Sequence, residues 1–191
     1  MRGCPAVPGL AAAEACCGRP EVREYDLGAR GDQERFWEMW EARQAEVVLV
    51  IRRPNGRVVL QTKGFYPPGA YRLPTGGIRP QEDLLAAVRR EMREETGLEA
   101  RIVRFLGVLC YRFTRRGEAM TRASYVFLLQ AGTEEMRPQD GQERISGFRE
   151  VPVDELEGVA AHLEGLAGEW AVWGGFRALV HRFVAEAGGS T

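Results

Sequence analysis

The chain contains apolar runs of two different periods, which predict strands and helices in mixed order. Short runs rich in β-branched or aromatic residues predict strands over residues 47–51, 58–60, 102–113, 122–129 and 147–152. Residues 53–56, Arg-Pro-Asn-Gly, separate the first two runs and are typical of a hairpin turn. Apolar residues at helical spacing predict helices over residues 32–40, 81–96, 153–156 and 173–187. Elements of both kinds in this order indicate an α/β sandwich, with helices on both sides of a mixed sheet.

Length and charge fit one globular domain. The 191 residues can bury a sizeable core, and 45% of them are hydrophobic and 28% charged, an ordinary balance. A net charge of −1 gives no field that would attract nucleic acid or an anionic membrane, so we expect no stable nucleic acid binding. No apolar run is long enough to span a membrane. Pro5, Pro8 and Glu14 interrupt the start of the chain, so we expect a flexible tail over residues 1–20, no signal peptide and a cytoplasmic protein.

The cysteines give no signal for a metal or disulfide framework. Cys4, Cys16, Cys17 and Cys110 form no CxxC spacing, and three of them lie in the first twenty residues. We therefore expect a reducing compartment, in which cysteines stay free.

Three glutamates of the helix predicted over residues 81–96 share one face. Glu91, Glu94 and Glu95 are spaced i, i+3, i+4 and so cover about 100° of the helix surface. Leu84 and Val88 fall on the same side, one and two turns earlier. The acids therefore continue the apolar stripe that the helix is expected to bury.

Acids in such a position need a compensating cation. Like charges at these spacings repel by roughly a few tenths of a kcal/mol, and the helix dipole disfavours acids in the last turn by about 0.3–1 kcal/mol. Mg²⁺, which prefers oxygen ligands, resolves both problems and satisfies buried carboxylates. The alternative is a solvated acidic helix end, with Arg90 and Arg93 in salt bridges to the glutamates. The preceding pair Gly76-Gly77 favours the metal, because glycines let a backbone turn approach a ligand closely.

The residues around these glutamates resemble the Nudix box. Its pattern is G-x5-E-x7-R-E-U-x-E-E-x-G-U, where U is an aliphatic residue. Gly76 and Glu82 fill the first two fixed positions, and residues 90–98, REMREETGL, fill the others, with Met92 as an acceptable aliphatic. Residues 71–74, Tyr-Arg-Leu-Pro, are similar to the family's lead-in, and residues 147–156 to its closing strand and helix. Thr75 departs from the pattern, since many members have glycine there, and this leaves the backbone of the loop before the box open.

The resemblance implies a fold and an arrangement of parts. We expect a Nudix-like α/β/α sandwich with a mixed β-sheet and flanking N- and C-terminal helices. Residues 21–191 would form this single domain, with the catalytic core at about residues 44–160.

The resemblance also implies roles within the box. One to three Mg²⁺ ions would be bound, with Mn²⁺ as a substitute, by the Gly76 carbonyl and the carboxylates of Glu91, Glu94 and Glu95. Arg90 would take part in catalysis by orienting Glu91 through a charge-assisted hydrogen bond. Glu82 would act structurally and tie down the loop.

Residues outside the box would complete the site. Many relatives draw the general base or a further ligand from a later loop, and Glu143 is expected here because it precedes residues 147–152 at a similar distance; a solvated loop acid is the alternative. Lys63 and Arg72 lie in segments that would flank the substrate phosphates, with surface charge as the alternative for each. Tyr66, Tyr111 or Tyr125 could stack on a nucleotide base, although aromatics in strands more often belong to the core.

The implied activity is Mg²⁺-dependent hydrolysis of a pyrophosphate bond in a nucleoside diphosphate-linked or nucleoside triphosphate substrate. The metal would lower the pKa of the attacking water, and a carboxylate would take its proton. The alternative function is a non-catalytic Nudix-like module that senses a nucleotide or binds a protein. The tryptophans of the flanking helices would form a homodimer face or cap the core; they are Trp37, Trp40, Trp170 and Trp173.

Overall fold

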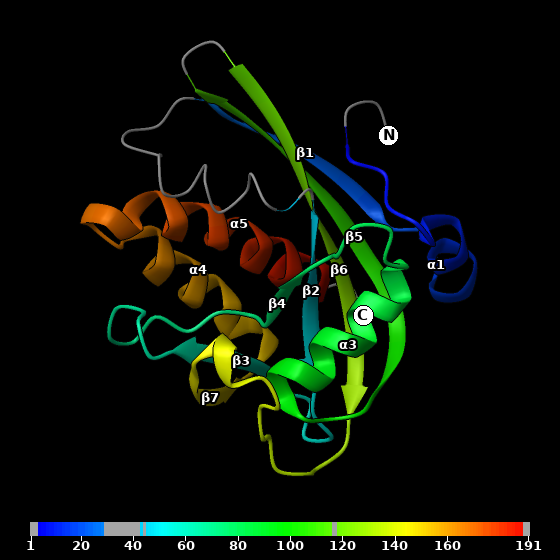
Figure 1. Cartoon of the computed structure of the whole chain (residues 1–191). Helices are drawn as coiled ribbons and strands as arrows, with labels where there is room; N and C mark the ends of the chain where they lie inside the picture. Colours follow the sequence, from blue (N-terminus) through cyan, green and yellow to red (C-terminus); the bar gives the residue numbers. More distant parts are fainter. Residues whose placement is uncertain (1–3, 29–42, 44, 116–117, 189–191) are drawn as a thin grey trace.

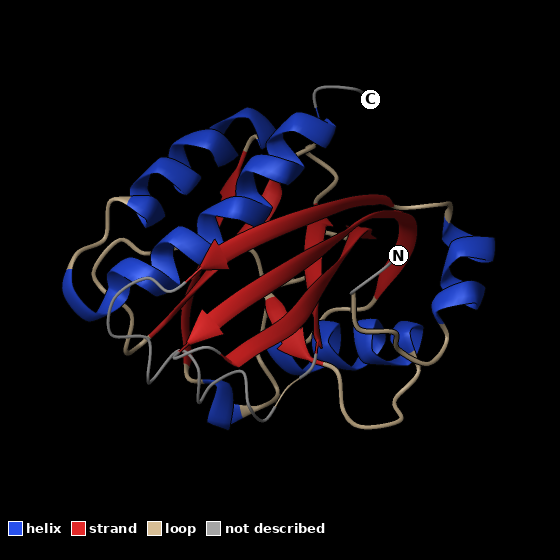
Figure 2. Ribbon diagram, turned by 90° about the horizontal axis from the view of Figure 1, so that it is seen from above, coloured by secondary structure: helices blue, strands red, loops and turns tan. Residues whose placement is uncertain are grey.

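The protein folds as two layers of helices around a seven-stranded mixed sheet (Figure 1; Figure 2). The computed structural model describes residues 4–28, 43, 45–115 and 118–188. The strands are β1 (Glu21–Gly28), β2 (Ala45–Arg52), β3 (Val58–Lys63), β4 (Thr75–Gly77), β5 (Ala100–Arg115), β6 (Glu118–Ala131) and β7 (Ile145–Val151). The helices are α1 (Leu10–Cys17), α3 (Leu84–Thr96), α4 (Leu156–Glu164) and α5 (Ala171–Gly188), with the 3-10 turns η1 (Gly141–Glu143), η2 (Val153–Glu155) and η3 (Gly168–Trp170). The α/β/α sandwich predicted from the sequence is confirmed.

Strand β2 shows why the sheet is covered on both faces. Its residues from Ala45 to Ile51 are all buried. Because side chains alternate along a strand, Val47 and Leu49 pack in the core formed with α1 and α3, whereas Val48 and Val50 pack in the core formed with α4 and α5. A strand that is buried from Ala45 to Ile51 therefore needs a helical layer on each side.

The sheet is mixed because some neighbouring strands run parallel to each other and others run antiparallel. The order is β1-β5-β6-β2-β3-β7, and β4 pairs with β2 outside this path. Strands β5 and β6 form a long antiparallel hairpin, and β3 pairs antiparallel with β7. Strand β2 runs parallel to β6, and β1 runs parallel to β5. The predicted strands are confirmed, and most extend further than their apolar runs, whereas β7 ends one residue before the predicted end. The hydrophobic pattern predicts neither β1 nor β4.

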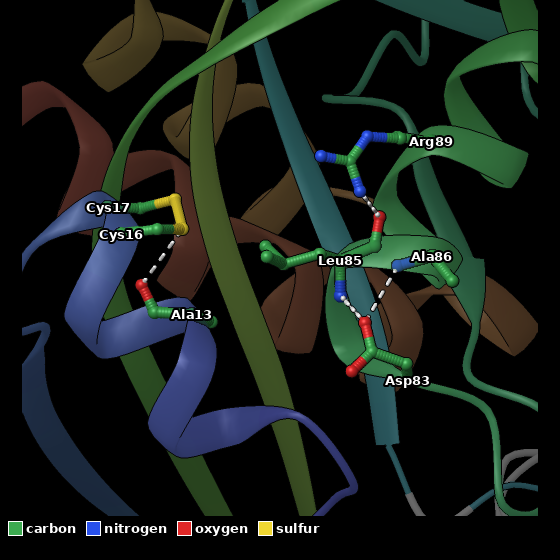
Figure 3. The surroundings of a disulfide bond; sticks show 7 residues. All are labelled: Ala13, Cys16, Cys17, Asp83, Leu85, Ala86 and Arg89. Atoms are coloured by element: carbon green, nitrogen blue, oxygen red, sulfur yellow. Dashed lines mark hydrogen bonds between the residues drawn. A yellow bond between two sulfur atoms is a disulfide. The ribbon is translucent and has the colours of Figure 1, made fainter.

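Helix α3, which carries the acidic face, has a clear start and end. The Asp83 side chain caps it by accepting hydrogen bonds from the N–H groups of Leu85 (3.0 Å) and Ala86 (3.2 Å), as Figure 3 shows. The helix starts after this cap and not at Gln81, because Gln81 has φ 62° and cannot continue a right-handed helix. Gly97 ends it with φ 71°, as the sequence predicts.

Residues 4–20 are packed, in contrast to the flexible tail expected over residues 1–20. They include α1, whose Ala13 is fully buried in the core shared with α3. The Pro8 carbonyl accepts a hydrogen bond from Leu84 N–H (2.9 Å), and Cys4 forms a disulfide with Cys110 on β5. The small residues of this segment fill the space beside α3, which composition alone does not reveal.

The four cysteines are paired, which corrects the expectation of free thiols. Besides Cys4 and Cys110, the neighbours Cys16 and Cys17 form a disulfide at the end of α1, near the first turn of α3 (Figure 3). Cys4 and Cys110 are separated by 106 residues in sequence. Sequence spacing missed this pair because a disulfide requires nearby Cβ atoms in the fold and no regular spacing.

The structure describes only part of the predicted tryptophan-bearing flanking helices. The helix predicted over residues 32–40, with Trp37 and Trp40, lies outside the described residues. Trp170 and Trp173 pack against Tyr66, with ring centroids 5.8 and 4.8 Å away, so these two tryptophans cap the core. Among the described residues, the helices are all too short or too polar to cross a bilayer.

Candidate active site

The acidic face of α3 is turned inward, as its spacing predicts. Leu84 and Val88 are fully buried, and Glu91 and Glu95 continue the same stripe with 4% and 0% exposure. Glu94 keeps partial contact with solvent. The carboxylates therefore extend from the apolar core to the surface along one side of the helix.

Arg90 joins two of these acids, Glu91 and Glu94. Its Nη1 donates hydrogen bonds to Glu91 Oε1 (2.6 Å) and Glu94 Oε2 (2.8 Å). Its Nε and Nη2 donate to the two oxygens of Glu82 (2.7 and 2.8 Å), a bidentate pair that lowers the pKa of Glu82. Nη2 also donates to the Gly77 carbonyl (2.8 Å). Arg90 thus holds both the helix acids and the loop before the helix, in the arrangement that the sequence implies.

The segment before the helix requires glycine at position 76, where it contacts Glu91. A Cβ atom added to Gly76 would overlap the Glu91 carboxyl group. Gly76 and Gly77 lie on β4, which pairs with the start of β2. Gly76 therefore lets a sheet strand approach the acidic face of α3 without a side chain between them.

The Glu95 carboxylate is buried with few partners. Its Oε1 accepts a hydrogen bond from Gln61 Nε2 (2.8 Å), and Lys63 Nζ lies 3.8 Å from the same oxygen. Its Oε2 is buried and has no hydrogen-bond partner among the described residues. Burial raises the pKa of Glu95 to about 7, although the charges of Arg72 and Lys63 oppose this. Gln61 is a residue of the site that the sequence did not indicate.

Glu143 reaches the site, although it lies in the turn η1, 48 residues beyond Glu95 in the sequence. Lys63 donates a hydrogen bond to Glu143 Oε2, and Glu143 is close enough to help raise the pKa of Glu91, which burial raises most. The structure therefore brings Lys63, Glu143 and the helix acids together. Their roles in binding and catalysis stay predictions.

Arg72 lies deeper than a phosphate contact at the surface would. It is 3% exposed, and its Nη1 donates hydrogen bonds to the Leu73 carbonyl (2.8 Å) and Thr75 Oγ1 (2.9 Å). Its Nε donates to Tyr66 Oη (2.9 Å). These contacts give Arg72 an internal role beneath the site, where its charge acts on Glu95. They also explain Thr75, whose hydroxyl supplies an acceptor that glycine lacks.

The tyrosines considered for base stacking are mostly core residues. Tyr111 and Tyr125 are 1% and 0% exposed. Tyr66 is half-buried between Arg72 and the tryptophans of η3 and α5. Burial leaves Tyr111 and Tyr125 no free ring face for a base.

The donor set fits a hard divalent cation in its chemistry. Carboxylate and carbonyl oxygens are the ligands that Mg²⁺ prefers, and the unpartnered Oε2 of Glu95 is such a ligand. Within the described part of the chain, however, no three acidic, histidine or cysteine side chains stand together as a ready-made ligand set. Arg90 and Lys63 hold the oxygens of Glu91, Glu94 and Glu143 instead. Cation binding would therefore require some of these contacts to be exchanged.

Comparison with known families agrees with this geometry. The NUDIX domain family matches residues 42–171, more than half of the chain. The chain belongs to the Nudix family. The matched range contains β3, β4, α3 and η1, so it includes all the residues of the acidic site.

Two curated plant proteins share segments with this Nudix chain. Nudix hydrolase 19, chloroplastic, from Arabidopsis thaliana is 45% identical over 53 residues, which cover 28% of this chain and 12% of that protein. Nudix hydrolase 6 from the same plant is 27% identical over 115 residues, which cover 59% of this chain and 36% of that protein. The chain thus matches well under half the length of each relative.

Two solved structures of other proteins are similar to this chain in the path of the backbone. A MutT protein from Methanosarcina mazei Go1 has 17% identity and a TM-score of 0.48, and the match covers 76% of this chain and 93% of that one. An Ap4A hydrolase from C. elegans, solved as a binary complex, has 16% identity and a TM-score of 0.48, with 77% and 98% covered.

Proposed function

We propose that this protein hydrolyses a pyrophosphate bond in a nucleoside diphosphate-linked or nucleoside triphosphate substrate, and that it requires Mg²⁺. The observation that carries this proposal is the row of three glutamates on α3 of a Nudix chain: Glu91 and Glu95 are buried, and Arg90 donates hydrogen bonds to Glu91 and Glu94. A polyanionic substrate would be repelled by these acids unless cations lay between them.

The residues that would hold the cation are those of the acidic face. Glu91, Glu94 and Glu95 would supply carboxylate ligands, and the Gly76 carbonyl a further one. When bound, Mg²⁺ would neutralise the pyrophosphate and lower the pKa of the attacking water, and Mn²⁺ would serve as a substitute.

The chain's own side chains would carry the other tasks. Arg90 would keep Glu91 and Glu94 in place, as its hydrogen bonds to both indicate. Glu143 would take the proton from the attacking water, while a new bond forms from the water oxygen to phosphorus and the bond from phosphorus to the bridging oxygen breaks. Lys63 would release Glu143 as the substrate enters and turn its charge toward the phosphate oxygens.

A nucleotide panel tests this proposal directly. Nucleoside triphosphates, dinucleotide polyphosphates and nucleoside diphosphates linked to another group would be incubated with the protein and Mg²⁺ in ¹⁸O-labelled water. We expect at least one substrate to be cleaved at a pyrophosphate bond, with ¹⁸O on one product phosphate and no turnover in EDTA. Absence of metal-dependent phosphate release across the whole panel would overturn the proposal.

A glutamine variant tests the assigned acids. We expect Glu94→Gln to lower kcat/KM by about a thousandfold, equivalent to about 4 kcal/mol, without loss of the fold. Glu99→Gln is the matched control. Glu99 is an exposed glutamate just beyond the end of the same helix, and it forms an ion pair with Arg93. Equal activity of the two variants would show that the acid at position 94 has no catalytic role.

A non-catalytic nucleotide-sensing or protein-binding module is the second candidate. It is favoured by the engagement of the carboxylates with Arg90 and Lys63, which leaves no ready-made ligand set in the described residues. Tight nucleotide binding that is independent of Mg²⁺, together with no turnover on the panel, would support this second function over the first.

A further inference from the structure

Strand β3 turns polar residues toward α3 where it passes the acidic face. Val59 packs in the core shared with α3, and the next residues on that side are Gln61 and Lys63, because side chains alternate along a strand. Val58 and Leu60 belong to the opposite core. Gln61 is therefore a polar residue at a position where the strand is otherwise buried and apolar, and it is 0% exposed.

The main chain fixes the position of Gln61. Its N–H donates to the Arg72 carbonyl (2.8 Å), and the Arg72 N–H donates to the Gln61 carbonyl (2.9 Å). This pair of bonds ties β3 to the segment that leads to the glycine loop. A fully buried side chain on a backbone held by this pair of bonds has little freedom to leave its partner.

The Gln61 amide is oriented by Glu95. A carboxylate accepts hydrogen bonds, so only the NH₂ end of the amide can face it, and Nε2 donates to Glu95 Oε1 over 2.8 Å. Two buried acceptors, Gln61 Oε1 and Glu95 Oε2, are left without partners among the described residues. Unpaired buried acceptors are unfavourable, so this pair of oxygens favours the entry of a cation or a hydrogen-bond donor.

Glu95 differs in this respect from the other two acids of the helix. Arg90 donates hydrogen bonds to Glu91 and Glu94, whereas the Glu95 carboxylate is oriented by a neutral amide from a different element. The neutral amide fixes Oε1 without adding a charge, and Lys63 Nζ, 3.8 Å from the same oxygen, is not hydrogen-bonded to it, so Oε2 stays without a partner among the described residues.

We propose that Gln61 is the positioning residue of Glu95, holding one carboxylate oxygen so that the other is available to a divalent cation. This inference rests on the proposed function, because it assigns the cation to the same acids. Gln61 acts through Glu95 and not on the substrate. Its removal should therefore weaken cation binding more than it lowers the turnover of the loaded protein.

Metal binding to the full chain tests the proposal without an activity assay. Binding of Mn²⁺ would be measured by electron paramagnetic resonance for the wild type, Gln61→Leu and Gln61→Met; the second variant keeps an unbranched chain of similar length in case leucine does not fit. We expect Mn²⁺ to bind about 10- to 100-fold more weakly to both variants, the effect typical of residues that orient metal ligands. Gln130→Leu is the matched control. Gln130 is a part-buried glutamine of β6 that bonds to Arg52 and to backbone carbonyls, and we expect unchanged Mn²⁺ affinity there.

A double variant separates positioning from packing. If Gln61 acts through Glu95, adding Gln61→Leu to Glu95→Gln should weaken Mn²⁺ binding no further than Glu95→Gln alone. Additive losses, or wild-type Mn²⁺ affinity in both single variants at position 61, would overturn the proposal.

The outcome is distinguishable from failure of the proposed function. If the wild type cleaves a nucleotide, excess Mg²⁺ should restore most of the kcat of Gln61→Leu and raise only the Mg²⁺ concentration that it needs. If the wild type binds Mn²⁺ but cleaves nothing, weaker Mn²⁺ binding in the variants would still support the positioning role. Unchanged Mn²⁺ binding beside normal wild-type turnover would refute only the role of Gln61.

Discussion

Two buried glutamates, Glu46 on β2 and Glu95 on α3, receive different partners from the fold. They are 3% and 0% exposed. Glu46 Oε1 accepts hydrogen bonds from Arg177 Nη1 (2.7 Å) and Ser124 Oγ (2.8 Å). Glu95 Oε1 accepts one from the neutral amide of Gln61. A guanidinium therefore hydrogen-bonds one acid directly, whereas Lys63 Nζ lies 3.8 Å from Oε1 of the other, beyond hydrogen-bond distance.

The difference separates an acid held in an ion pair from one that keeps a buried oxygen without a hydrogen-bond partner among the described residues. Arg177 on α5 and Glu46 on β2 join a helix of one layer to the sheet, so their ion pair acts as an internal tie. Burial raises the pKa of Glu95 to about 7 against the opposing charges of Arg72 and Lys63, so the folded protein holds a proton there until near neutral pH. Burial alone therefore does not distinguish the two acids; a directly hydrogen-bonded cationic side chain does.

The largest expected effect comes from removing the partner of Glu46. Arg177→Met should destabilise the protein by about 3–5 kcal/mol, because it leaves a buried carboxylate without its cation. Urea unfolding measures this loss. Arg182→Met on the same helix is the control, since Arg182 forms exposed pairs with Glu157 and Glu164 that contribute at most about 1 kcal/mol. Similar small losses in both variants would mean that the two acids do not differ as described.

Removing the charge of Glu95 should have the opposite sign. Its pKa is about 7 in the folded protein and about 4.5 in the unfolded chain, so the folded state binds an extra proton between these values and stability falls as pH rises from about 4.5 to 7. Glu95→Gln removes this loss. In EDTA it should stabilise the protein by up to about 3 kcal/mol at pH 8 and by almost nothing below about pH 4.

Two controls sharpen that measurement. Glu46→Gln should destabilise the protein at pH 8, because it leaves the Arg177 guanidinium unpaired in the interior. Adding Mg²⁺ should stabilise the wild type more than Glu95→Gln and so shrink the difference between them. A destabilised Glu95→Gln protein in EDTA at pH 8 would contradict the conclusion that burial of the charged Glu95 carboxylate is unfavourable.

The local part of the site was predictable from the sequence. The spacing of Glu91, Glu94 and Glu95 fixes their common face through helix geometry alone, and Gly97 ends the helix where a left-handed residue is needed. The first strands were also predictable, because their apolar runs and the turn between them are local patterns. Each of these features depends on residues within a few positions of one another.

The partners that give the two buried glutamates their different behaviour were not predictable. Gln61 lies 34 residues from Glu95, and Arg177 lies 131 residues from Glu46. No local period relates such residues, and a single glutamine after a β-branched run gives only a weak signal that a buried polar partner is needed. Long-range packing also decided the burial of Arg72, which is 3% exposed although a surface charge was one expectation for it; its contact with substrate phosphates stays a prediction.

The smallest expected effect concerns His181, which connects the Glu46 side of the molecule to the loop before Gly76. Its Nε2 accepts a hydrogen bond from Leu73 N–H (3.0 Å), and its Nδ1 lies 2.7 Å from the Arg177 carbonyl, so the neutral ring donates there. Burial lowers the pKa of His181 from 6.5 to about 4. Between these values the unfolded chain binds a proton that the folded protein does not, so stability falls as pH decreases from about 6.5 to 4.

His181 lowers the stability as pH falls, whereas Glu95 raises it, over the shared range of about pH 4.5–6.5. In the wild type these two pH-dependent contributions to stability largely cancel. His181→Gln keeps an acceptor for the Leu73 N–H and removes the histidine slope. Relative to the wild type, its stability in EDTA should therefore rise by about 2 kcal/mol as pH falls from 6.5 to 4.5. Urea unfolding at the two pH values measures this difference. A variant whose stability follows that of the wild type across the range would show that the two buried groups do not oppose each other.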